Sequence, residues 1–232
     1  MLPTVILPGY LESSKAYLSL AQDLTQQGSP TTVVPTNFRD WLPTIGGRSM
    51  VPILRLLHQT VTAVLAELGV NQINLIGHSA GGWIARMYLG EVPYTIHHDI
   101  SADEGLWNAQ RQVATLICLG TPQFSGEKWT KKNLNFVNDN YPGAFYPEVN
   151  YVCVAGKSVY GQLQWGSLLA YQSYQLTCGT GKTWGDGITP IEAAHLAGAK
   201  NLVIENVKHS PRSRDPWYGS PIALAAWSQY LQ

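Results

Sequence analysis

The sequence predicts an α/β fold, with a mostly parallel sheet of about six strands and helices on both of its faces. One observation is that short apolar, β-branched runs alternate along the 232 residues with segments of helical spacing. Such alternation is typical of parallel sheets covered by helices. The other is that the runs are short and apolar enough to be strands buried on both faces. The length fits a single domain over residues 1–232.

Six runs are predicted to be strands: Val5–Leu7, Thr31–Pro35, Gln72–Ile76, Val113–Leu119, Tyr151–Ala155 and Asn201–Val207. The clearest helix is predicted over Met50–Leu68, where apolar residues recur at the spacing of one helix face. Ser49 stands where an N-cap is expected, and Gly69 where the chain leaves in a left-handed turn. Further helices are expected over Ser13–Gln27, Ala80–Leu89, Pro190–Leu196 and Pro221–Leu231.

Three segments interrupt this alternation, at about 91–112, 121–149 and 165–185. They are longer than ordinary connections in a compact α/β domain. Loops at the carboxyl ends of parallel strands are where such sheets form ligand sites and lids. We therefore expect these segments to be cap insertions, with a short helix near Leu168–Tyr174 in the third.

The charge of the chain excludes some classes of partner. It has 15 basic and 15 acidic residues, only 13% of the chain is charged, and no cluster of Lys or Arg occurs. Nucleic acids and anionic membranes both require a concentrated basic surface. We expect neither a nucleic-acid partner nor a stable membrane anchor. We find no signal peptide and no uncharged apolar run long enough to span a bilayer, so we expect a cytoplasmic location.

The strongest local motif is Gly-His-Ser-Ala-Gly at 77–81, which follows a predicted strand and precedes a predicted helix. This strand–turn–helix setting is that of a nucleophile elbow, in which glycines allow the strained turn that exposes a serine. Ser79 is therefore the candidate nucleophile. The alternative is an ordinary glycine-rich junction with a capping serine.

An activated serine requires a histidine base and normally a carboxylate. His209 lies just past the last predicted strand, which puts it at the same edge of the sheet as Ser79. Asp186 lies between them in the chain and is flanked by glycines, so it is the preferred acid. Asp139 and Asp99 are weaker alternatives, because both lie in inserted loops. The ring of His78, inside the elbow, is expected to pack or hydrogen bond beneath the turn.

An acyl-transfer site also needs two donors for the oxyanion of its intermediate. The amide of Ala80, directly after the nucleophile, is one candidate. The amide of Tyr10, after Leu-Pro-Gly at the end of the first strand, is the other. Taken alone, this second segment is equally compatible with a simple strand-end turn.

These motifs together resemble lipase- and esterase-type α/β-hydrolases. The resemblance rests on the elbow at 77–86, Leu-Gly-Thr-Pro at 119–122, the Gly-Asp-Gly loop and the closing His-Ser-Pro. More narrowly, Asp-Trp-Leu at 40–42 and Trp-Tyr-Gly-Ser-Pro at 217–221 are similar to a subgroup from oxygenic photosynthetic bacteria and plant plastids. The resemblance implies the α/β-hydrolase fold, with Ser79, Asp186 and His209 as the triad. Pro-Gly replaces the common His-Gly at the oxyanion loop.

We therefore expect a serine hydrolase that cleaves a carboxylic ester through an acyl-enzyme. Its substrate is expected to be a small-molecule or lipid ester, bound partly by Trp83, Trp107 and Trp165. The alternatives are an acyltransferase with the same triad and a non-catalytic lipid-binding relative. No cofactor or metal is expected, because the neighbouring His97 and His98 do not have the usual ligand spacing.

Overall fold

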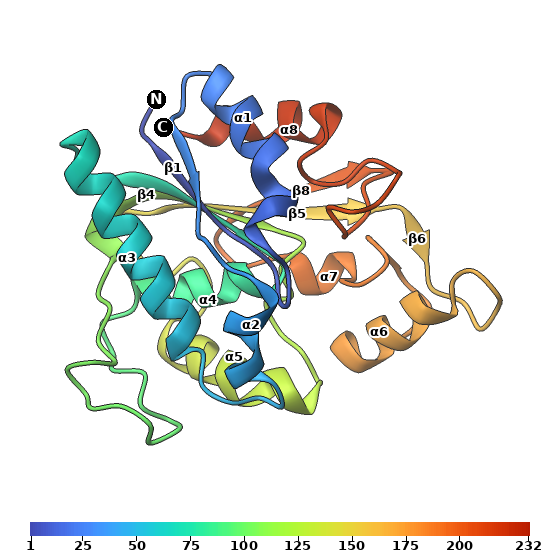
Figure 1. The fold of residues 1–232 in the computed structure, drawn as a ribbon. Helices are drawn as coiled ribbons and strands as arrows, with labels where there is room; N and C mark the ends of the chain where they lie inside the picture. Colours follow the sequence, from blue (N-terminus) through green and yellow to red (C-terminus); the bar gives the residue numbers. More distant parts are fainter.

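The computed structural model describes residues 1–232 and contains a six-stranded sheet in the order β2–β1–β3–β4–β5–β8 (Figure 1). Every neighbouring pair in this sheet is parallel. The predicted fold class is therefore confirmed. The strands are β1 (Thr4–Leu7), β2 (Thr31–Val33), β3 (Ile73–His78), β4 (Val113–Leu119), β5 (Asn150–Lys157) and β8 (Lys200–Glu205). Two short strands, β6 (Val159–Tyr160) and β7 (Trp184–Gly185), form a separate antiparallel pair.

The sheet separates two apolar cores, and successive residues of each central strand point into different ones. In β4, Leu116 and Cys118 belong to the larger core, whereas Ile117 and Leu119 belong to the smaller. Helices α3 (Val51–Leu68), α4 (Ala80–Leu89) and α5 (Lys128–Asn140) cover the larger core. Helices α1 (Leu18–Gln26) and α8 (Pro221–Trp227) cover the smaller core on the opposite face (Figure 1).

The prediction that all six strands are buried on both faces is wrong for the two outer ones. Strand β2 is only partly buried, and Val203 of β8 is 45% exposed. No further strand or helix covers these outward positions, so solvent reaches them. Leu202 and Ile204 of β8 still pack against the smaller core, which is sufficient to attach the strand.

Helix α3 begins one residue later than expected. Met50, and not Ser49, occupies its N-cap position, and the Ser49 hydroxyl accepts only the Val51 N–H at 3.3 Å. Gly69 ends the helix in the left-handed conformation, as predicted, with φ 62°. By length and composition α3 is apolar enough to span a membrane. Its apolar residues, however, lie in the larger core, as expected for a central helix of an α/β domain.

Helix α4 has the predicted ends, Ala80 and Leu89, whereas the other predicted helices are present with different ends. The first divides into a 3₁₀ turn (Ser14–Tyr17) and α1, and the last ends at Trp227 before a 3₁₀ turn over Ser228–Tyr230. Helix α7 spans only Ile191–Ala194, whereas α6 extends over Leu168–Cys178. The short helix α2 (Phe38–Trp41) and the 3₁₀ turns at Leu42–Thr44 and Gln110–Gln112 complete the chain.

The three segments expected to be insertions differ in character. Segment 121–149 contains α5, whose Leu134 and Val137 are buried, so this connection between β4 and β5 is partly an ordinary covering helix. Segment 165–185 contains α6 and β7, and segment 91–112 has no helix before the turn at Gln110. A role of these segments as a cap stays a prediction.

Asn74 in β3 joins the two ends of the chain, at Leu2 and Gln232. Its side-chain nitrogen donates to the carbonyls of Leu2 and Gln232, at 3.3 and 3.1 Å, and its oxygen accepts the Gln232 N–H at 3.1 Å. The side chain is fully buried. Its loss would remove all three hydrogen bonds and leave the Gln232 N–H without a partner within the chain.

We expect Asn74→Ala to lower the free energy of unfolding by about 1–3 kcal/mol, because it removes three hydrogen bonds that each contribute on the order of 1 kcal/mol. Urea denaturation measures the change. Asn71→Ala is the matched control, because Asn71 is exposed in the loop before the same strand. Equal effects of the two substitutions would contradict a role for Asn74 in holding Leu2 and Gln232 together.

Candidate active site

Ser79 lies in the sharp turn between β3 and α4. Its backbone has φ 52° and ψ −125°, a conformation that costs on the order of 1–3 kcal/mol for a residue other than glycine. Its N–H donates to the Leu119 carbonyl at 2.8 Å, which attaches the turn to β4. A Cβ at Gly77 would lie 2.5 Å from the backbone of Gly81 and Gly82. The glycines around Ser79 are therefore required by the close approach of strand and helix.

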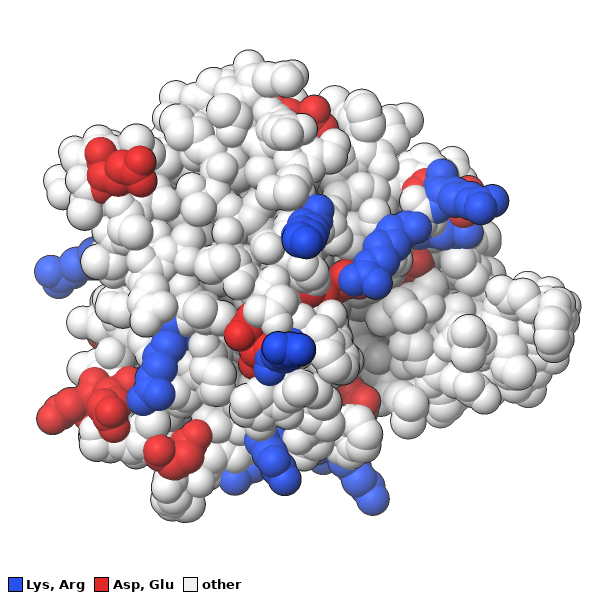
Figure 2. Space-filling view, in the orientation of Figure 1, with Lys and Arg blue, Asp and Glu red and all other residues white.

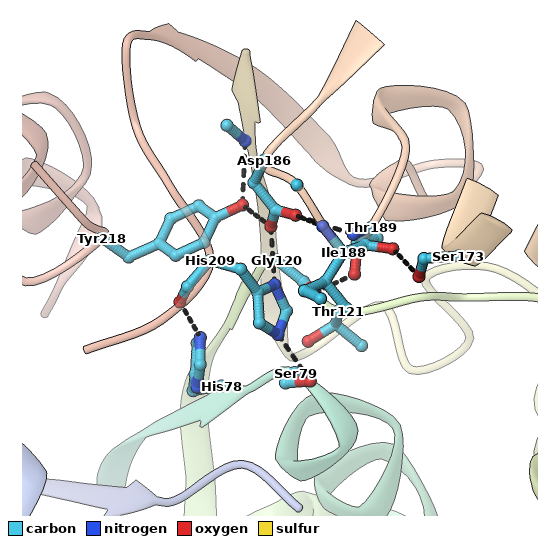
Figure 3. Close-up of polar contacts among 12 residues, drawn as sticks. His78, Ser79, Gly120, Thr121, Ser173, Asp186, Ile188, Thr189, His209 and Tyr218 are labelled. Atoms are coloured by element: carbon cyan, nitrogen blue, oxygen red, sulfur yellow. Dashed lines mark hydrogen bonds and ion pairs between the residues drawn. The ribbon is translucent and has the colours of Figure 1, made fainter. Parts of the chain in front are cut away.

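Ser79, His209 and Asp186 form one hydrogen-bonded chain (Figure 3). The Ser79 hydroxyl lies 2.9 Å from His209 Nε2, and His209 Nδ1 lies 2.7 Å from Asp186 Oδ2. With Nδ1–H donating to the carboxylate, Nε2 is free to accept the serine proton. The structure thus brings together all three residues that the sequence analysis selected. Asp139 and Asp99, the weaker alternatives, are exposed and make no hydrogen bond with His209.

The carboxylate of Asp186 is buried, with its side chain fully inaccessible to solvent. Burial alone would raise its pKa, but the neighbouring His209 and several hydrogen bonds outweigh burial and keep the pKa below its usual value. Oδ1 accepts the N–H groups of Ile188 and Thr189, at 2.9 and 2.7 Å. The carboxylate is therefore ionised and fixed in direction at neutral pH.

Tyr218 is a partner of Asp186 that the sequence analysis missed. Its hydroxyl donates to Asp186 Oδ2 at 2.6 Å and accepts the Gly156 N–H at 2.9 Å (Figure 3). Burial and the adjacent carboxylate raise the pKa of Tyr218, so it remains a donor. The tyrosine lies in the segment 217–221 that contributed to the family resemblance, but no spacing in that segment indicated a contact with the acid.

The two predicted oxyanion donors lie beside Ser79 and line the same cavity. Ala80 is the first residue of α4, so its N–H precedes the hydrogen bonds of the helix. The Tyr10 N–H has no hydrogen-bond partner within the chain, whereas the preceding Gly9 N–H donates to the Tyr17 hydroxyl at 3.0 Å. Both predicted amides are therefore available to a ligand oxygen.

A cavity of about 410 Å³ opens next to Ser79 and His209. Part of its wall is apolar and aromatic, formed by Tyr10, Met50, Trp83, Trp129, Leu176 and Ile188. Hydroxyl groups form much of the rest, from Thr44, Ser125, Thr130, Ser173, Thr177 and Thr189. Glu127 is the one Asp, Glu, Lys or Arg among the lining residues. The arrangement suits an uncharged ligand with both apolar and polar parts.

The structure brings only one of the three predicted substrate-binding tryptophans to this cavity. Trp83 lines it and is almost completely buried. Trp107 packs beside His58 and Tyr88, and Trp165 is fully exposed at 101%; neither lines the cavity. Trp129 contributes to the wall instead. A tryptophan in an inserted segment can pack within that segment or face solvent, and its sequence position alone does not separate these cases.

No group of three or more His, Cys, Asp or Glu side chains is arranged to hold a metal ion. His97, which the sequence analysis considered as a ligand, hydrogen bonds through Nε2 to Asn133 Oδ1 at 2.7 Å. Asn133 is fully buried, so this histidine ties the 91–112 segment to α5.

No protein-family model matches the sequence, and a search of curated proteins gives no match. Among solved structures, a protein of Lactobacillus plantarum described as a cell surface hydrolase has a TM-score of 0.53 and 13% identity, covering 99% of this chain and 91% of that chain. The product of the gene lin2722 of Listeria innocua has a TM-score of 0.52 and 12% identity, covering 97% and 92%. Lipase B of Aspergillus fumigatus has a TM-score of 0.47 and 10% identity, covering 87% of this chain and 44% of the lipase. With the parallel sheet, the first two likenesses show that the fold is that of the α/β-hydrolases.

The lowered pKa of Asp186 gives an expected dependence of stability on pH. A depressed carboxyl pKa stabilises the folded state above the unfolded value, about 4, and this stabilisation is lost as the pH falls through the folded value. We therefore expect Asp186→Asn to lower the free energy of unfolding at neutral pH, and the difference to shrink below about pH 4. Urea unfolding across this range, with the exposed Asp139→Asn as control, measures it. A difference independent of pH would contradict the assignment.

Proposed function

We propose that this protein is a serine-dependent hydrolase of carboxylic esters. The single observation that supports this most is the hydrogen-bonded chain from Ser79 through His209 to Asp186, which ends at a cavity large enough for a small ester. The strained turn at Ser79 adds to it, because such backbone conformations persist where they place a reactive group. The fold is shared with known hydrolases, but a fold hosts many activities, so the proposal rests on the site.

In the proposed reaction, Ser79 Oγ attacks the acyl carbon while His209 Nε2 takes the hydroxyl proton. The bond from the acyl carbon to the alcohol oxygen then breaks, and His209 returns the proton to the leaving alcohol. Water, deprotonated by the same imidazole, hydrolyses the acyl-serine and restores Ser79. Asp186 keeps Nδ1 protonated and stabilises the imidazolium that forms in each half of the reaction.

The amides of Tyr10 and Ala80 are the proposed donors to the negatively charged oxygen of each intermediate. Removing one such donor typically costs about 2.7–4 kcal/mol of transition-state stabilisation. A backbone donor has no side chain of its own to substitute. The Tyr10 amide can, however, be displaced by a substitution at the neighbouring Gly9. A Cβ at Gly9 would lie 2.9 Å from His78 Nδ1 and 3.2 Å from Ser79 Cβ, so the loop of Tyr10 is closely seated on the elbow.

The proposed substrate is a neutral ester with an apolar acyl group. The cavity has apolar and hydroxyl walls and no cationic side chain that would pair with a phosphate or carboxylate. Residues 158–181 contain no Asp, Glu, Lys or Arg, and Leu163, Trp165 and Leu169 in this stretch are highly exposed. Figure 2 shows the lobe around α6, at the right of the view, as a surface without charged side chains. Leu176 continues this uncharged segment into the cavity wall.

Two finer expectations remain as proposals beside this one. Transfer of the acyl group to an alcohol would use the same three residues, and product analysis in the presence of glycerol measures its share. The narrower resemblance to proteins of photosynthetic bacteria and plastids adds no substrate to the proposal.

We expect Ser79→Ala to abolish labelling by a fluorophosphonate probe and to reduce hydrolysis of p-nitrophenyl butyrate by at least about a thousandfold, as for loss of an activated nucleophile. Ser19→Ala is the matched control, because Ser19 is exposed on α1 away from the cavity. Labelling or turnover that persists in Ser79→Ala would overturn the proposed function.

Glu127 is expected to disfavour anionic acyl groups through its charge at the cavity wall. p-Nitrophenyl butyrate and p-nitrophenyl hydrogen succinate differ mainly in a terminal carboxylate. We expect Glu127→Gln to raise the ratio of kcat/KM for the succinate to that for the butyrate about fivefold, the effect of removing one like charge near a protein surface. Glu67→Gln, at an exposed position of α3, is the control. An unchanged ratio would exclude Glu127 from substrate selection.

A further inference from the structure

We infer that Tyr17 and His78 are positioning residues, which join the oxyanion loop at Gly9 to the backbone of His209 through one buried hydrogen-bonded chain. This inference rests on the proposed ester hydrolysis, because it concerns how two parts of that site keep their relative positions. Neither residue lines the cavity. Their proposed effect is on the placement of the amide of Tyr10 and the imidazole of His209.

The chain consists of three short contacts, two of which join residues distant in the sequence. The Gly9 N–H donates to the Tyr17 hydroxyl at 3.0 Å, and that hydroxyl lies 2.7 Å from His78 Nδ1. On the other side of the ring, His78 Nε2 lies 3.0 Å from the carbonyl oxygen of His209, as Figure 3 shows. Tyr17 and His78 are 0% and 1% exposed, so water does not substitute for these contacts.

The direction of every hydrogen bond in the chain follows from its last member. A carbonyl oxygen only accepts, so His78 Nε2 carries the proton and donates to His209. In a neutral imidazole the other nitrogen then accepts, so the Tyr17 hydroxyl donates to Nδ1. The oxygen of that hydroxyl accepts from Gly9 in turn. Donors and acceptors therefore alternate without conflict from the oxyanion loop to the base.

The hydrogen-bonded chain keeps the same donors and acceptors across the working range of pH. Burial lowers the pKa of His78 to about 3, with repulsion from His209 as the next cause. Burial also raises the pKa of the Tyr17 hydroxyl. His78 consequently stays neutral and Tyr17 stays protonated while His209 exchanges protons with substrate. A second imidazole this close to the base, with ring centroids 4.9 Å apart, is thus prevented from competing for the proton.

The Gly9–Tyr10 peptide shows why this attachment matters for the oxyanion. The Gly9 carbonyl accepts the Glu12 N–H at 3.0 Å, while the Gly9 N–H is taken by Tyr17. Both polar groups of Gly9 are therefore fixed. In a planar trans peptide the N–H points opposite to the carbonyl, so the Tyr10 N–H is directed away from Glu12 and left without an internal partner. The Gly9 N–H belongs to the preceding Pro8–Gly9 peptide, so the bonds to Tyr17 and from Glu12 hold the two peptides on either side of Gly9. Loss of the Tyr17 bond would release the first of them and loosen the loop that presents the Tyr10 N–H.

The first test is Tyr17→Phe, which removes the hydroxyl but keeps the ring that packs against His78 and Trp217. We expect kcat for p-nitrophenyl butyrate to fall on the order of tenfold, with KM within about twofold, as for an interaction made in the transition state. Tyr141→Phe is the matched control, because its buried hydroxyl accepts the Val92 N–H at 2.7 Å and it does not line the cavity. We expect that control to lose stability without losing kcat. Equal kcat values for Tyr17→Phe and the unchanged protein would overturn the inference.

Substitutions of His78 separate the two ends of the chain. Gln places its amide near the position of Nε2 and can still donate to His209, whereas Leu removes both contacts. We expect His78→Gln to recover part of the kcat that His78→Leu loses. We also expect Tyr17→Phe to cost little further kcat when added to His78→Leu, since the chain is then already broken. Additive losses would show that the two side chains act separately and would overturn the inference.

A spectroscopic measurement does not depend on turnover. Nitrogen-15 NMR of the full chain is expected to show His78 as the neutral Nε2–H tautomer from about pH 5 to 9, well above its lowered pKa. An Nδ1–H tautomer, or a titration of His78 within this range, would contradict the proposed hydrogen-bonded chain from Gly9 to His209. If fluorophosphonate fails to label Ser79 in the unchanged protein, the proposed function fails. If it labels the unchanged protein and Tyr17→Phe at the same rate, only the positioning role fails.

Discussion

The buried carboxylate of Asp186 is the constraint on which the rest of the site depends. An ionised group without solvent is stable only when its oxygens are fully hydrogen bonded. Here the loop after β7, Tyr218 and His209 all contribute, through contacts of 2.6–2.9 Å. The need to satisfy this charge therefore brings together segments that follow different strands. His209 faces Ser79 because its opposite nitrogen is tied to Asp186.

The sequence was sufficient to predict the sheet and the three hydrogen-bonded side chains of the candidate site, for physical reasons. Buried parallel strands are short and almost continuously apolar, and the elbow glycines are required by contacts as close as 2.5 Å, so both leave strong local patterns. Tyr17 and Tyr218 left no such pattern. Their hydroxyls contact residues far along the chain, His78 for Tyr17 and Gly156 for Tyr218, and no pattern in the neighbouring residues indicates these contacts.

The tryptophans of the chain, eight in all, were harder to interpret than its motifs. Trp83 and Trp129 line the cavity, Trp107 packs against neighbouring rings, and Trp165 faces solvent. The same residue type thus has three environments, so residue type alone did not identify the rings that line the cavity. Edge strand β8 gives a similar lesson, since an apolar sequence did not ensure burial on both faces. The composition of a segment predicts which environments its side chains can occupy, whereas the residues packed around the segment decide which one they do occupy.

The wholly parallel order of the sheet has a consequence for how the site forms in time. Ser79 and His209 are 130 residues apart, and His209 follows β8, the last strand to join the sheet in sequence order. Contacts of such long sequence separation carry a large loop-closure entropy and are slow to form. Ser79 therefore gains its contact with His209 only after the C-terminal third of the chain has docked. Recovery of serine reactivity during refolding is a direct measure of that final docking step, distinct from the earlier gain of helix and sheet.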